Sequence, residues 1–136
     1  MKHHTKDKGD IGIGYTIADL LSKGIQVCLP ISEHQPYDLI GIYPDNSVKK
    51  ISVKYRKSMR GNIQVKLESC YSDSKGVHIK PIDKLSIDML AIYCPDTNKV
   101  YYVNHNNSNL TVTLRVTKPK NNQVKGISFA DDYLVP

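Results

Sequence analysis

The stretch PYDLIGIYPDNSVKKISVKYRK, residues 36–57, has the pattern of two β-strands joined by a turn at Pro44-Asp45-Asn46. Apolar residues occupy most of its strand positions, but Asp38 and Lys54 stand among them. A buried or half-buried charge is costly unless another group pairs with it. Each of these two residues therefore needs a partner or a function.

Alternation along the second strand places Ser52 and Lys54 on one face of the sheet. The other face carries the apolar residues Ile51, Val53 and Tyr55. If the two strands are antiparallel neighbours, the Asp38 carboxylate comes close to the Lys54 ammonium. Such a pair has two interpretations. A carboxylate that holds Mg²⁺ beside a lysine that orients or deprotonates water can cleave a phosphodiester, whereas a structural ion pair is the commoner arrangement at a sheet surface.

The rest of the chain predicts one helix and several short strands. A helix is expected over residues 11–23, with Asp10 as its N-cap and an apolar stripe at Ile13, Ile17, Leu20 and Leu21. Strands are expected at residues 26–29, 37–43, 48–56, 62–67, 88–94, 100–104 and 110–116. Residues 69–76 are expected to be a loop, and residues 127–136 a short docked helix or strand. This order indicates a single mixed α/β or α+β domain over residues 1–136, with a basic N-terminal segment and a C-terminal tail.

Composition narrows the class of protein. The 136 residues carry a formal net charge of +6, concentrated in residues 2–8, 49–66 and 115–125. This charge suits a polyanion such as nucleic acid, although many solvated surfaces are equally basic. No apolar run approaches the roughly 20 residues of a membrane span, and no export signal is recognised. The three cysteines are widely spaced and typical of reduced core thiols, which favours the cytoplasm.

Five segments carry a resemblance to a known family. They are KDKGDIG (6–12), ADLL (18–21), PYDL (36–39), DMLAIYCPDTNKVYYV (88–103) and LRVTKPKNNQVKGISFADDY (114–133). Together they resemble the bacterial group I intron-associated PD-(D/E)XK endonucleases over nearly the whole chain. The resemblance implies an α/β, restriction-endonuclease-like core with a mixed central sheet flanked by helices. It also implies Mg²⁺-dependent cleavage of double-stranded DNA, at a long target spanning the intron insertion site in the homing members.

The resemblance assigns roles to the opening stretch. Asp38 corresponds to the metal-binding aspartate and Lys54 to the catalytic lysine, and the Val53 carbonyl would complete the protein ligands of Mg²⁺, with Mn²⁺ as the alternative ion. Two positions depart from the family pattern. Ile13 replaces a glutamate of the first helix, and Ser52 stands where glutamine or glutamate is usual. A degenerate protein that binds duplex DNA without cutting it is therefore the alternative to an active nuclease.

Other residues have simpler explanations. Ile13 extends the apolar stripe of the predicted helix, so it has a place in the core. Asp10 and Glu33 are the carboxylates that might have replaced the missing ligand, but a helix cap explains Asp10 better and a loop charge explains Glu33.

Basic and polar residues after the second strand are the candidates for DNA contact. On a ribbon that enters a major groove, alternating side chains reach base edges or phosphates. The candidates are Tyr55, Arg56, Lys57, Arg60, Asn62, Gln64 and Lys66, and Lys118, Lys120 and Lys125 are assigned to phosphates. Arg56 and Arg60 are the candidates for reading guanine, although phosphate neutralisation is the commoner fate of a basic side chain.

Two further interpretations and one assembly follow from the same residues. The nine tyrosines would allow base stacking on single-stranded nucleic acid, but those of the 88–104 hairpin suit sheet packing better. A purely structural protein with a basic, partner-binding face is the third class. For a nuclease, one site cuts one strand, so a homodimer or a homotetramer is expected on double-stranded DNA.

Overall fold

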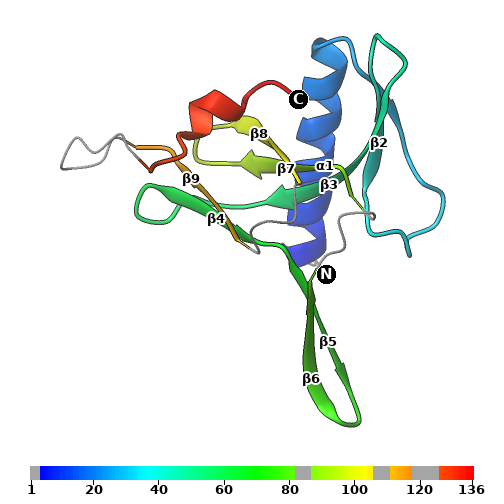
Figure 1. The fold of residues 1–136 in the computed structure, drawn as a ribbon, viewed down its shortest axis with the longest axis vertical. Helices are drawn as coiled ribbons and strands as arrows, with labels where there is room; N and C mark the ends of the chain where they lie inside the picture. The colour runs from blue at the N-terminus through cyan, green and yellow to red at the C-terminus, as the bar shows by residue number, and fades with distance from the viewer. Residues whose placement is uncertain (1–3, 82–86, 106–110, 118–125) are drawn as a thin grey trace.

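A five-stranded mixed sheet forms the centre of the computed structural model, which describes residues 4–81, 87–105, 111–117 and 126–136 (Figure 1). The strand order is β1-β2-β3-β7-β8, and every neighbouring pair is antiparallel except the parallel pair β3–β7. The strands are β1 Gln26–Cys28, β2 Leu39–Ile42, β3 Val48–Tyr55, β7 Met89–Cys94 and β8 Lys99–Asn104. The expectation of a mixed α/β fold with a mixed central sheet is confirmed.

Helix α1, His4–Ser22, covers one face of this sheet (Figure 1). Its buried stripe is Gly12, Thr16 and Leu20, spaced four residues apart. Gly12 faces β3, and a Cβ atom there would lie 3.5 Å from Val53 Cγ1, an ordinary van der Waals contact. The core on this side is built around Leu20, Ile25, Leu39, Ile51, Met89, Ala91, Tyr93, Val100 and Tyr102.

The helix differs from the expected one in two respects. It begins at His4 and not at residue 11, so Asp10 lies exposed inside the helix and is not its N-cap. Leu21 is 56% exposed and lies outside the core. Apolar periodicity reports where a helix is packed against the body, and the first two turns of α1 are exposed, so the pattern missed them.

A two-stranded ribbon covers the opposite face of the sheet. It pairs β4, Asn62–Lys66, with β9, Thr111–Arg115, in antiparallel register. The ribbon and the short 3-10 helix η1, Ala130–Tyr133, close a second core that contains Ile63, Val65, Leu67, Leu90, Ile92, Cys94, Tyr101, Leu114 and Ala130. Because both faces of the sheet are covered, β7 is buried at all six positions, which accounts for its unbroken apolar run.

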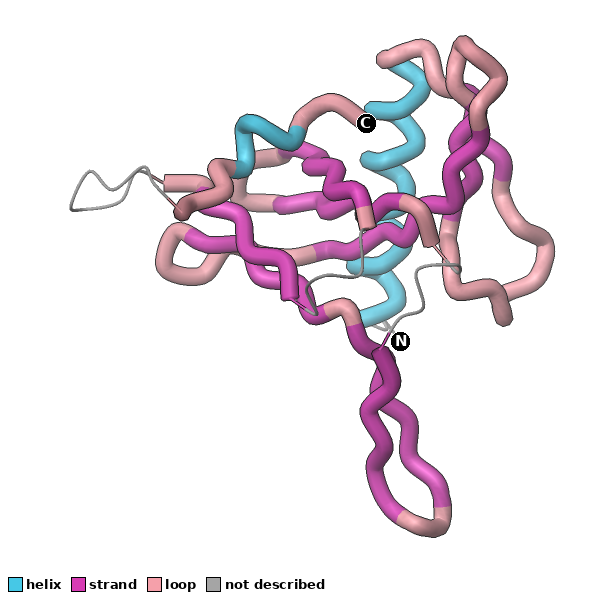
Figure 2. Tube along the Cα trace, viewed as in Figure 1, coloured by secondary structure: helices cyan, strands magenta, loops and turns pink. Residues whose placement is uncertain are grey.

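The segment expected to be a loop at residues 69–76 is instead part of a hairpin. Strand β5, Glu68–Asp73, pairs with β6, Gly76–Pro81, and the hairpin projects away from the rest of the chain (Figure 2). Strands β5 and β6 pair only with each other, through backbone hydrogen bonds that do not depend on side-chain type. The apolar alternation on which strand prediction depends is therefore weak in such a segment.

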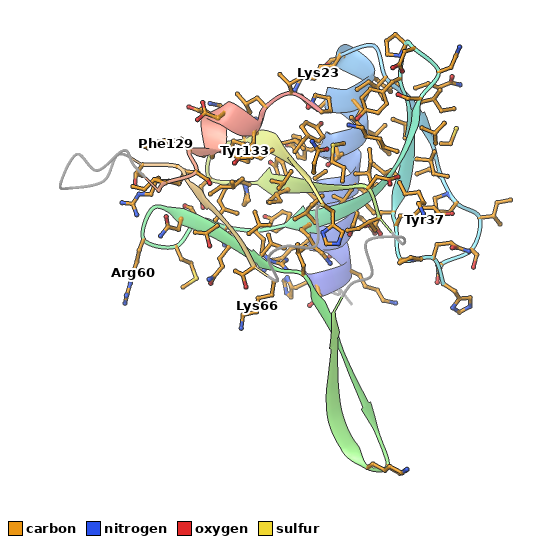
Figure 3. The ribbon with its side chains drawn as sticks, in the orientation of Figure 1. Lys23, Tyr37, Arg60, Lys66, Phe129 and Tyr133 are labelled. Atoms are coloured by element: carbon orange, nitrogen blue, oxygen red, sulfur yellow. The ribbon has the colours of Figure 1, made fainter. Side chains whose placement is uncertain are left out.

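A polar network ties the C-terminal half of α1 to β8 and to the end of the chain. Tyr102 Oη donates a hydrogen bond to Asp19 Oδ2, and Lys23 Nζ lies 2.8 Å from the same oxygen. Lys23 Nζ also donates to the Leu134 carbonyl at 2.6 Å, beside η1 (Figure 3). Burial, and then the neighbouring Asp19 carboxylate, raises the pKa of Tyr102, so its phenol remains a donor. The C-terminal residues are thus docked, and the expected short helix there is confirmed.

No helix in the described part of the chain is long and apolar enough to cross a membrane.

Candidate active site

Asp38 immediately precedes β2 and lies beside β3. The first residue of β2, Leu39, pairs with Ile51. One residue earlier, the Asp38 N–H donates to the Ile51 carbonyl at 2.9 Å, and Asp38 Oδ2 accepts the Val53 N–H at 2.7 Å. The carboxylate therefore takes the place of a strand partner for the Val53 N–H. Its other oxygen, Oδ1, makes no hydrogen bond within the described residues.

The backbone of β3 also directs the Val53 carbonyl toward Asp38. In an extended strand, the N–H and C=O of one residue point to the same side. Since the Val53 N–H meets the Asp38 carboxylate, the Val53 carbonyl faces the same edge of the sheet. Together, the two residues present a carboxylate oxygen and a carbonyl oxygen, which are the hard donors that Mg²⁺ prefers.

Lys54 occupies the opposite face of β3 from Val53, beside a buried Ser52. Ser52 is 4% exposed, and its hydroxyl makes no hydrogen bond to any described residue. The pKa of Lys54 is lowered by burial and then by the nearby Arg56 guanidinium, against a smaller opposing effect of Asp38. A partly desolvated lysine of this kind gives up its proton more readily than an exposed one.

The structural ion-pair interpretation of Asp38 and Lys54 is wrong. Within the described residues, the two side chains form no salt bridge, and Lys54 has no hydrogen-bond partner. They still lie near enough for the Asp38 charge to act on Lys54. Asp38 Oδ1 and Lys54 Nζ thus make no hydrogen bond to any described residue.

Ile13 takes a place in the core. It is partly buried and packs against the cluster between α1 and the sheet, as its place on the apolar stripe predicts. Asp10 and Glu33 are both exposed. No group of three or more His, Cys, Asp or Glu side chains able to hold a metal occurs in the part of the chain that the structure describes. Asp38 is therefore the carboxylate of this candidate site.

An open depression adjoins Lys54. It has a volume of about 440 Å³ and lies between the first turns of α1 and the C-terminal end of β3. Its walls are formed by Thr5, Lys8, Gly9, Val53, Lys54, Tyr55, Arg56 and Lys57. Lys8 is a lining residue that sequence reasoning did not single out, although it belongs to the basic segment at residues 2–8.

The chain that follows β3 is held in place by the turn between β7 and β8. Asp96, in the turn between β7 and β8, accepts hydrogen bonds from the Ser58 N–H at 2.6 Å and from Ser58 Oγ at 2.8 Å. These two bonds lower the pKa of Asp96, so the carboxylate stays ionised. Asp96 is a positioning residue that sequence reasoning missed, because nothing in a turn sequence identifies its distant partner.

A tight turn then leads into the ribbon. Met59 and Asn62 exchange hydrogen bonds of 2.8 and 3.0 Å between their N–H and carbonyl groups. Arg60 and Gly61 between them have φ of +53° and +80°, the left-handed pair that a two-residue hairpin turn requires. A Cβ atom at Gly61 would lie 2.1 Å from Thr117 Oγ1, so this position has room only for glycine.

The exposed face of the ribbon and its turn carry four of the ten predicted DNA contacts, Arg60, Asn62, Gln64 and Lys66. Gln64 and Lys66 are exposed on β4, and Asn62 is partly exposed. Their cross-strand partners are Thr113, Thr111 and Arg115, which sequence reasoning missed because the register of β9 is not visible in the chain. Figure 3 shows Arg60 and Lys66 pointing to the same side of the ribbon.

The other predicted contacts have different fates. Arg56 and Lys57 line the depression, where Arg56 is partly exposed and Lys57 is exposed. Tyr55 packs against the core, with its ring 5.6 Å from that of Tyr93, and does not belong to the ribbon face. Tyr101 and Tyr102 are buried in the hairpin, so the packing interpretation of these tyrosines is confirmed. The predicted phosphate contacts Lys118, Lys120 and Lys125 lie outside the described residues.

Comparison with known proteins decides the family. A family profile described as PD-(D/E)XK endonuclease matches residues 3–136. The chain belongs to the PD-(D/E)XK endonuclease family. A solved structure titled as that of a bacterial homing endonuclease, I-Ssp6803I, has the same fold, with a TM-score of 0.76 and 18% sequence identity over 96% of this chain and 88% of that one. No curated protein sequence matches.

Membership of the PD-(D/E)XK family confirms the resemblance and the fold class expected from the sequence. It makes the chain a member of a nuclease family, whose enzymes generally use divalent metals. The roles of individual residues remain predictions.

The Asp38–Val53 hydrogen bond separates two roles of the carboxylate. We expect Asp38→Asn to keep the amide oxygen as an acceptor and to leave the free energy of unfolding within about 0.5 kcal/mol of wild type. Asp38→Ala strands the part-buried Val53 N–H and should cost about 1–3 kcal/mol. Urea unfolding measures both, and calorimetric titration with Mn²⁺ should show that both variants lose metal binding. Equal stability of the two variants would contradict the structural role.

Proposed function

We propose that this protein is a Mg²⁺-dependent, site-specific endonuclease that cuts double-stranded DNA, a homing endonuclease associated with a group I intron and acting in the cytoplasm. The observation that carries the proposal is the edge of β3, where the Asp38 carboxylate meets the Val53 backbone beside an unpaired, partly buried Lys54. Membership of a nuclease family and the fold shared with a homing endonuclease support it.

Asp38 Oδ1 and the Val53 carbonyl are the protein groups that would hold the metal. Mg²⁺ commonly keeps several waters and takes only one or two carboxylates, together with substrate phosphate oxygens. A set of one carboxylate and one carbonyl therefore fits Mg²⁺, and Mn²⁺ accepts the same oxygen donors. When bound, the ion would stabilise the negative charge that develops on the phosphate oxygens.

Lys54 would handle the proton of the attacking water. Its lowered pKa increases the fraction of neutral amine at neutral pH, and a neutral Nζ accepts a proton from water. After accepting it, the ammonium lies near the phosphate and favours its negative charge. Asp38 orients this arrangement through its hydrogen bond to the residue that precedes Lys54.

The degenerate alternative rests on two specific positions. Ile13 and Ser52 supply neither a carboxylate nor an amide where the family has them, and Ile13 is committed to core packing. A protein of this kind would keep its DNA-binding surface and lose the cut. Cleavage by Ile13→Glu but not by the wild-type chain would favour this alternative.

Cleavage of a plasmid that carries the intron-free insertion site of the host gene tests the enzyme. We expect Mg²⁺-dependent cutting by wild type, and Lys54→Met should reduce the rate by about 10²–10⁴-fold or more. Lys54→Met should also unfold at higher urea concentration, because it removes an ammonium from a partly desolvated place. Since the folded state lowers the pKa of Lys54, this stability difference should shrink as the pH rises toward the ordinary lysine value.

The control for this variant is Lys57→Met, which removes an exposed charge three residues along the chain and should change stability little. Binding without cutting by the wild-type protein would establish the degenerate alternative. Neither binding nor cutting would defeat both proposals.

The exposed ribbon face is proposed to enter the major groove, where a two-stranded antiparallel ribbon fits. Gln64 is a neutral side chain suited to adenine, whereas Lys66 suits a phosphate. We expect Lys66→Ala to reduce the slope of log K against log salt by about 0.9, and Gln64→Ala to weaken only the specific site, by about 1–3 kcal/mol. Fluorescence anisotropy at several salt concentrations measures both. A purely structural protein would bind with no salt dependence.

We also propose that two or four copies act together, since each site cuts one strand of a duplex. Light scattering of the free protein and of its DNA complex should give the mass of a dimer or a tetramer. A monomer in both samples would contradict this assembly.

A further inference from the structure

The depression beside Lys54 has an unusual charge. Among the described residues that line it, Lys8, Lys54, Arg56 and Lys57 are cationic and none is acidic. The cations come from two elements that are far apart in sequence, since Lys8 belongs to α1 and the others to the end of β3 and the residues after it. The fold therefore gathers positive charge in a concave place where none is neutralised by a lining carboxylate.

Two of these cations are free of protein partners. Lys8 and Lys54 make no salt bridge or hydrogen bond to any described residue. The Arg56 guanidinium donates one bond, from Nη1 to the Tyr55 carbonyl at 2.8 Å, which leaves its other donors available. N–H donors of this kind, on an open surface, match the oxygens of a phosphate group.

The Asp38 carboxylate offsets this charge only in part, since its effect on Lys54 is smaller than that of burial or of Arg56. Asp38 is not among the residues that line the depression, and one of its oxygens is already bonded to the Val53 N–H. Ile13 and Ser52 add no negative charge, and the described residues contain no larger group of metal-ligating side chains. In a site with several carboxylates, a phosphate is repelled until a cation neutralises them. Here the balance favours the phosphate before any metal binds.

We infer that this depression is a binding site for a phosphate of the DNA backbone that works without a metal ion, with Lys8 and Lys57 as its dedicated contacts. The inference rests on the proposed action on DNA and adds to it a separate requirement. The duplex can then bind before Mg²⁺ does, whereas cutting needs both. The N-terminal end of α1, which carries the positive end of the helix dipole, faces the same place and adds to the attraction.

Two helical glycines give a matched test. Gly9 lines the depression and Gly14 does not, both are exposed, and a Cβ atom at either would meet nothing within 4 Å. Gly9→Glu and Gly14→Glu therefore make the same change in net charge and in helix propensity. We expect Gly9→Glu to weaken duplex binding roughly tenfold or more, and Gly14→Glu less than about threefold.

The measurement is fluorescence anisotropy of a labelled duplex with the full chain, in EDTA and in Ca²⁺. Wild type should bind the duplex in EDTA, and Ca²⁺ should raise that affinity by less than about tenfold. Lys8→Ala should reduce the salt slope by about 0.9, and Lys6→Ala, which removes an exposed lysine outside the depression, should leave it unchanged. Circular dichroism and urea unfolding confirm that each variant is folded.

The outcomes separate this inference from the function on which it rests. Wild-type binding that appears only with Ca²⁺, or equal losses in Gly9→Glu and Gly14→Glu, would overturn the metal-independent phosphate site and leave the nuclease proposal intact. A wild-type chain that binds no duplex under either condition would overturn both.

Discussion

The parallel pairing of β3 with β7 is the constraint on which the rest of the structure depends. It joins Ile51 with Met89 and continues to Tyr55 with Tyr93. Parallel neighbours cannot be joined by a short turn, so the chain must cross over between them. That crossover, residues 56–88, carries β4 to the far face of the sheet, where β9 joins it. The same requirement that completes the sheet thus produces the exposed ribbon beside β3, the strand that carries Lys54.

Polar side chains lie where a backbone donor of β3 has no partner in β2. Strand β2 ends opposite the middle of β3, and the Asp38 carboxylate takes over the backbone donor that is left at Val53. A carboxylate used in this way stabilises the fold and is held in one orientation, with its second oxygen free. Lys54 lies in the same region at a cost, because burial disfavours its charge. Arg60, a non-glycine residue with a left-handed backbone, is a further local cost near the proposed DNA surface.

On each face of the sheet, hydrogen bonds join segments that are distant in the chain. Asp96 fixes Ser58, and Arg115 Nη1 lies 3.3 Å from Asn62 Oδ1, so the turn before β4 is held from both the β7–β8 turn and β9. On the other face, Asp19 and Lys23 fix α1 to Tyr102 and to the C-terminal residues. A nuclease site would need fixed placement of this kind, because a small misplacement of a reacting group lowers the rate of catalysis. The depression lined by Lys8 exists only because α1 is held against β3.

The sequence by itself predicted the strands β1, β2, β3, β4, β7, β8 and β9, because their apolar patterns and turns are local properties. It also indicated the family, through five segments of which PYDL contains Asp38, and it located the departures at Ile13 and Ser52. Only the tertiary structure decided what these residues touch. The Asp38–Val53 hydrogen bond depends on where β2 ends, the partners of Gln64 and Lys66 depend on the register of β9, and the position of Lys8 depends on a helix that begins at His4. Each of these relations joins residues that are distant in the chain. Local propensity carries no information about such pairs, because their contact is determined by the packing of both cores.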